Sequence, residues 1–125
     1  MNVGAVTASA EWDVRSELER LWRALSKEQN HAAGSLHFLS TNWEELEALH
    51  NALMLLESVR AETLKLLASL PTPTETLTVI NTLASTLRAE MLTRWDLRQF
   101  RASEAVARIL VLILDAEIGI GSAKQ

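Results

Sequence analysis

Apolar residues recur along the first third of the chain at steps of three, four or seven positions. This spacing places them on one face of a helix, because an α-helix turns once every ~3.6 residues. The repeat continues without a change of phase through Asn30 and Gly34. The pattern therefore predicts a helix over residues 10–39, capped by Ser9 and weakest near His31–Ser35. The apolar positions of this helix face are Val14, Leu18, Leu21, Leu25, Ala32, Leu36 and Leu39.

A second amphipathic segment runs from the sequence Thr41-Asn42-Trp43-Glu44 to about Leu70. Thr41 and Glu44 match a capping box, in which a hydroxyl and a carboxylate accept hydrogen bonds from unpaired backbone amides. Two neighbouring apolar rows cover about half of this helix, which predicts contact with two other helices. The first row is Leu46, Leu49, Leu53, Leu56, Leu64 and Leu67, and the second is Ala52, Leu55, Val59, Leu66 and Leu70.

Pro71 and Pro73 end the second helix, because proline has no amide hydrogen and clashes with the preceding turn. Thr72 and Glu75 form a second capping box, with Pro73 at the first helical position, where proline is tolerated. The connections at 40–41 and 71–72 are short, so we expect the first three helices to run up, down and up. The predicted fold class is all-α, an antiparallel bundle of three long helices plus a C-terminal apolar helix.

The C-terminal half leaves two interpretations open. The apolar phase of the third helix continues to Ala116, so residues 73–118 could form one helix of roughly 69 Å. Alternatively, the chain breaks near Thr93 or Ser103 and folds back as a fourth helix, which is favoured because helices beyond about 40 residues are rare. Residues 106–114 are apolar on nearly all sides, which predicts either the innermost helix of the bundle or an interface between chains.

The composition supports one soluble domain. The chain has 125 residues, of which 48% are hydrophobic and 22% charged, and it contains no cysteine, which excludes disulfides and thiolate metal sites. Its longest apolar run is far shorter than the ~20 residues that span a bilayer, and no signal peptide is recognisable. We therefore expect a cytoplasmic protein without membrane contact. Gly119 is expected to stop the last helix, which gives a flexible N-terminus at 1–9, a helical-bundle domain at 10–118 and a C-terminal tail at 119–125.

Charge is distributed unevenly along the chain, whose net charge is −4. Residues 1–62 contain ten acidic and five basic residues, a net of −5, and residues 63–125 contain six and seven, a net of +1. The arginines of the second half are interleaved with aromatic residues, a pattern that can contact nucleic acid. Acidic residues dilute this stripe, so attraction to the cluster Glu44-Glu45-Glu47, within one chain or between two, explains it better. The stripe consists of Arg94, Arg98, Arg101 and Arg108.

Arg60 lies in the middle of the first apolar row of the second helix. A charge at such a position needs a carboxylate partner or a route to solvent. Antiparallel pairing with the first helix predicts Glu17 as the partner. The simpler interpretation is a side chain whose apolar stem covers the core edge while its charge reaches water; the other is a polar residue that fixes register or meets a partner.

No arrangement of residues predicts catalysis. Glu47 and His50 have the spacing of carboxylate-bridged di-metal bundles, but those sites need a second such motif, which the sequence lacks. His31 and His37 have no recognisable co-ligands, and the serines and threonines cluster at helix caps. The sequence contains no glycine-rich phosphate loop and no nucleophile elbow. We therefore expect no enzyme activity, no cofactor and no metal.

These observations favour a non-enzymatic protein that acts by protein–protein interaction, of the adaptor, chaperone or inhibitor type, and that self-associates as a homodimer or higher oligomer. The alternatives are a regulator that contacts nucleic acid through the arginine stripe and a ligand-binding or di-metal bundle. Partly exposed tryptophans and arginines are common anchors of protein interfaces. The predicted partner-binding residues are Trp22, Trp43, Trp95, Arg94, Arg98, Arg101, Arg108, Ile109, Leu110, Leu112 and Ile113.

Overall fold

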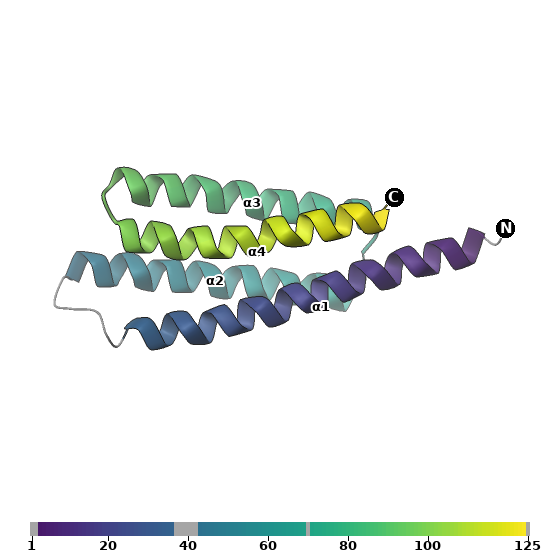
Figure 1. Cartoon of the computed structure of the whole chain (residues 1–125), viewed down its shortest axis with the longest axis horizontal. Helices are drawn as coiled ribbons and strands as arrows, with labels where there is room; N and C mark the ends of the chain where they lie inside the picture. Colours follow the sequence, from purple (N-terminus) through teal and green to yellow (C-terminus); the bar gives the residue numbers. More distant parts are fainter. Residues whose placement is uncertain (1–2, 37–42, 70, 125) are drawn as a thin grey trace.

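The described residues form four long helices, which lie side by side and alternate in direction (Figure 1). The computed structural model describes residues 3–36, 43–69 and 71–124, with side chains over 13–32, 43–69 and 71–122, and these ranges contain no strand. The all-α bundle and the up-down-up order of the first three helices are thus confirmed, and a fourth helix completes the bundle. The elements are α1 (Val3–Leu36), α2 (Trp43–Ser69), α3 (Pro73–Asp96) and α4 (Phe100–Lys124).

α4 is the innermost helix. It packs against α1, α2 and α3, whereas α3 has few contacts with α1 or α2. Val106, Ile109 and Ile113 on α4 are almost completely buried. The inner side of the apolar segment predicted at 106–114 is therefore covered by helices of its own chain, whereas Val111 on its outer side is 54% exposed. None of the described helices has the length and apolar character needed to cross a membrane.

The break between α3 and α4 lies at residues 97–99, between the two positions that the sequence left open. The Arg98 amide donates to the Trp95 carbonyl at 2.9 Å, and the Gln99 amide donates to the Arg94 carbonyl at 2.8 Å. These two bonds form a Schellman motif, in which the residue after the C-cap of the helix is left-handed. Arg98 is that residue, and its φ is 60°. Glycine usually occupies this position, so the sequence pattern carried no signal for the turn.

Two side-chain contacts hold the α3–α4 hairpin. The buried Ser103 hydroxyl on α4 donates to the Met91 carbonyl on α3 at 2.9 Å. The Arg94 guanidinium donates to Gln99 Oε1 at 2.8 Å across the turn. A neutral buried hydrogen bond contributes about 1 kcal/mol, so the turn is fixed by side chains as well as by its backbone.

Replacing Arg98 by glycine should raise the free energy of unfolding by about 0.5–1 kcal/mol. A side chain with a Cβ is strained in the left-handed region, and the relief exceeds the entropy that glycine adds to the unfolded chain. Urea denaturation in dilute solution measures the change. The control is Arg88→Gly in the exposed interior of α3, which should lower the same free energy by about 1 kcal/mol. Equal losses for both variants would contradict the assignment of the turn.

Helix ends differ from the prediction at both ends of the chain. α1 begins at Val3, so Ser9 lies inside the helix, and the first turns of α1 extend beyond the C-terminal end of α4 (Figure 1). α4 continues through Gly119 to Lys124, and Ile120 is completely buried, so the predicted tail at 119–125 is wrong. Gly119 marks a close approach instead of a helix stop, because a Cβ there would overlap the Glu17 carboxylate of α1.

The capping predictions have separate outcomes. The Thr72 hydroxyl accepts a hydrogen bond from the Glu75 amide at 3.1 Å, with Pro73 at the start of α3, which confirms that cap. Thr41 lies outside the described residues.

The second of the two predicted apolar rows of α2 is the more buried one, with Ala52, Val59 and Leu66 at most 7% exposed. Leu64, which was placed in the core row, is 53% exposed. α2 contacts both α1 and α4, which confirms the expected two neighbours. The buried positions of α2 are Ala48, Ala52, Leu56, Val59, Thr63 and Leu66.

Candidate functional site

Several large apolar side chains are exposed where α3 turns into α4. We call these residues, Leu92, Trp95, Leu97 and Phe100, the aromatic corner; each is between 45% and 60% exposed. The Trp95 and Phe100 rings meet edge to face, with centroids 4.6 Å apart and an interplanar angle of 63°. Isolated exposed apolar residues are ordinary, but a contiguous group marks an interaction surface.

The aromatic corner is held in place by the turn beneath it. Arg94 donates to Glu90 Oε1 at 2.6 Å and to Gln99 at 2.8 Å, so it links the last turns of α3 to the residue before α4. Trp95 and Phe100 are five residues apart and meet only because the backbone reverses between them. Their rings are therefore arranged before any partner binds, which lowers the entropy cost of binding.

The start of α2 lies at the same end of the bundle as the α3–α4 turn (Figure 1). Arg101 Nε on α4 lies 3.1 Å from Glu45 Oε1 on α2 and joins the two elements across this end. Trp43, the first residue of α2, is 74% exposed, and Glu44 and Glu47 beside it are exposed as well. We call the aromatic corner together with Trp43, Glu44, Glu47 and Arg98 the end surface.

Most of the arginine stripe is paired within the chain. Arg94 pairs with Glu90, Arg101 with Glu45, and Arg108 with Glu28 of α1 at 2.9 Å. Of these three pairs, Arg101–Glu45 alone involves the predicted acidic cluster at 44–47, and Arg94 and Arg108 pair with other carboxylates. Among the described residues Arg98 has no ion pair, so it is the member of the stripe whose charge remains available on the end surface.

The apolar residues predicted to bind a partner lie in the core. Ile109, Leu110 and Ile113 are at most 6% exposed, because the reversal at 97–99 lets the other helices cover them. Leu112 is half-buried and faces α1. The prediction of a partner-binding site on this segment is therefore wrong, and the exposed anchors lie one turn to either side of the break.

Arg60 has polar and aromatic partners on α1 instead of the predicted carboxylate. Its Nε donates to Ser26 Oγ at 3.0 Å, and its Nη1 donates to Gln29 Oε1 at 2.9 Å. The guanidinium carbon lies 5.0 Å from the centroid of the Trp22 ring, within range of a cation–π interaction. Trp22 is thus a half-buried internal contact rather than an exposed anchor.

Glu17 is not the partner of Arg60. It pairs with Arg20 at 3.9 Å and lies against Gly119 of α4, so it belongs to the α1–α4 side of the bundle. The prediction was wrong about the register of α1 against α2. The partners of Arg60, Ser26 and Gln29, lie nine and twelve residues after Glu17 on α1, which is about 13–18 Å along the helix axis.

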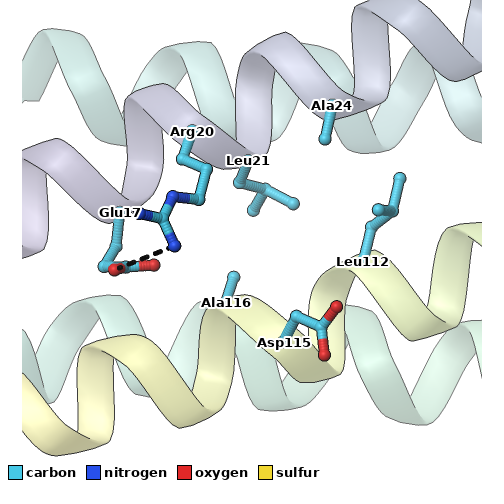
Figure 2. A pocket seen from close by; sticks show the side chains of 7 residues that line it. All are labelled: Glu17, Arg20, Leu21, Ala24, Leu112, Asp115 and Ala116. Atoms are coloured by element: carbon cyan, nitrogen blue, oxygen red, sulfur yellow. Dashed lines mark ion pairs between the residues drawn. The ribbon is translucent and has the colours of Figure 1, made fainter.

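A pocket of about 220 Å³ opens between α1 and α4. Figure 2 shows the α1 side chains facing those of α4 across it, with the Arg20–Glu17 ion pair at its edge. Two carboxylates, one guanidinium and an apolar floor provide no nucleophile–base pair. The pocket is lined by Glu17, Arg20, Leu21, Ala24, Leu112, Asp115 and Ala116.

Glu47 and His50, from which no metal site was expected, gain no further metal ligands among the described side chains. Glu47, His50 and His31 are exposed, and His37 lies outside the described residues. Within the described part of the chain, no group of three or more histidine, cysteine or acidic side chains is arranged to hold a metal ion.

Comparisons of the chain with protein-family models, curated proteins and solved structures give no match.

Proposed function

We propose that this chain is a non-enzymatic helical bundle that acts by binding another protein through its end surface. The observation that carries the proposal is the aromatic corner, whose apolar side chains are about half exposed although the turn beneath them is fixed by hydrogen bonds. Adaptors, chaperones and inhibitors all work through such a surface. A nucleic-acid regulator has less support, because three of the four arginines are paired with carboxylates.

The composition of the end surface resembles that of an interface centre. Tryptophan and arginine are the residue types that most often dominate binding energy, provided that a partner can exclude water from them. Trp43, Trp95 and Arg98 supply these types on one end of the molecule, and Phe100 packs against Trp95. The remaining exposed apolar residues, such as Met54 and Ile118, lie further along their helices, about three turns from Trp43 on α2 and about five turns from Phe100 on α4.

The double substitution Trp95→Ala and Phe100→Ala should abolish partner binding without unfolding the chain. Both side chains are about half exposed and their rings contact each other, so the free energy of unfolding should fall by only about 1–3 kcal/mol, whereas loss of two anchors should weaken binding at least about tenfold. The measurement is affinity capture from native lysate with the wild-type or the variant chain as bait, followed by quantitative mass spectrometry of the captured proteins. The control is Val111→Ala with Ile118→Ala, which removes exposed apolar side chains of α4 instead. Equal capture by all three chains would overturn the proposal.

A further inference from the structure

The end surface carries both halves of a self-complementary interface, and we infer that its partner is a second copy of this chain, docked end to end about a two-fold axis. The inference rests on the proposed function and names the partner for the same surface. The two halves are the start of α2, with Trp43, Glu44 and Glu47, and the α3–α4 turn, with the aromatic corner and Arg98.

Charge complementarity favours a second copy. In a two-fold interface each copy must present both a surface and its complement, because residue i of one copy contacts residue j of the other and the reverse also holds. Glu44 and Glu47 are exposed, and Arg98 is exposed without an ion pair among the described side chains. The Arg101–Glu45 pair already joins the two halves within one chain at 3.1 Å. The two-fold arrangement repeats that attraction between chains, with Arg98 of one copy against Glu44 and Glu47 of the other.

The exposed apolar area limits the size of this dimer interface. Three aromatic side chains of ~150–250 Å² each, about half exposed, provide roughly 300–400 Å² per copy. A stable interface buries about 800 Å² on each partner. The end surface therefore supports a small, reversible interface of the transient class. Because the charge pairs are exposed, added salt should weaken it further.

Charge reversal tests the arrangement. Arg98→Glu in both copies places carboxylates against Glu44 and Glu47, and the double variant Glu44→Arg, Glu47→Arg places guanidiniums against Arg98. Each variant alone should raise the dimer Kd at least about tenfold. An equimolar mixture should restore dimerisation, because both contacts of the mixed pair are again between opposite charges. Arg23→Glu, on the exposed middle of α1, matches the first charge change and should leave the Kd unchanged.

Sedimentation equilibrium of the full chain from about 1 µM to about 1 mM is the measurement. The expected result is a concentration-dependent shift from 13.9 kDa to twice that mass, lost in each variant and recovered in the mixture. A wild-type chain that stays monomeric, single variants that dimerise like wild type, or a mixture that stays monomeric would each overturn the inference. If wild type stays monomeric while the Trp95→Ala, Phe100→Ala variant still loses captured proteins, the proposed function survives and only the second copy is excluded. If the Trp95→Ala, Phe100→Ala variant captures the same proteins as the wild-type chain, both the proposed function and the inferred second copy are excluded.

Discussion

Replacing Ile113 by alanine should lower the free energy of unfolding by about 2–5 kcal/mol. Ile113 is completely buried on α4, the helix that contacts all three others. Removing its three outer carbons loses their transfer out of water and leaves a cavity that three packed helices cannot close. Urea denaturation followed by far-UV circular dichroism, in dilute solution where the chain is monomeric, measures the change.

Ile118→Ala on the same helix is the matched control. Ile118 is 70% exposed, so the same chemical change should alter the free energy of unfolding by no more than about 0.5 kcal/mol. The contrast separates two roles for the apolar segment of α4. If it covered a neighbouring chain, Ile113→Ala would weaken dimerisation and leave the stability of the monomer near that of the control. The buried position of Ile113 predicts the opposite outcome.

Periodicity predicted the buried face of α1 well, although this helix packs against both α2 and α4. Val14, Leu18 and Leu25 follow the α1 stripe and are all buried. It was less accurate on α2, where Leu64 is exposed. The more buried row of α2 is the second one, and the sequence alone does not show which of two apolar rows faces outward.

The α3–α4 turn carries no sequence signal of the usual kind. A break was expected somewhere in the second half, but the residue that makes the turn is Arg98, a type rarely found in the left-handed region. Its conformation is stabilised by bonds from Arg98 and Gln99 amides to carbonyls of α3, which follow from tertiary packing of α4 on α3. At Gly119 the error was the reverse, because a residue that usually ends helices instead accommodates Glu17.

The position of this turn also decided which candidate site residues could be predicted. Trp95 and Arg98 were identified from their residue types, whereas Leu92 and Leu97 were not, because the apolar phase gave them no distinct role. With a turn at residues 97–99, the side chains on either side of it become exposed, and the inner face of α4, which includes Ile109 and Ile113, becomes core. The candidate site thus exists because the backbone reverses direction at residues 97–99.

The other large effect is expected at Arg60, where alanine should lower the free energy of unfolding by about 1–3 kcal/mol. The substitution removes two hydrogen bonds from a charged donor, to Ser26 and Gln29, and the cation–π contact with Trp22. The guanidinium is only partly buried, so solvent compensates some of this loss. Arg60→Lys should recover less than half of it, because a compact ammonium can lie over the Trp22 ring but cannot direct two donors at separate acceptors.

A double-mutant cycle between Arg60→Ala and Gln29→Ala measures how much of this effect is specific to the contact. A direct hydrogen bond predicts a coupling free energy of about 0.5–1.5 kcal/mol in urea denaturation. Arg15→Ala with Glu19→Ala, an exposed ion pair within α1, should give a coupling of about 0.5 kcal/mol or less. Additive losses at Arg60 and Gln29 would mean that Arg60 acts through the apolar stem that it packs over the core edge. Coupled losses would mean that the α1–α2 register is held by a charge whose partners are neutral, so a one-turn slip of either helix would separate the guanidinium from both acceptors at once.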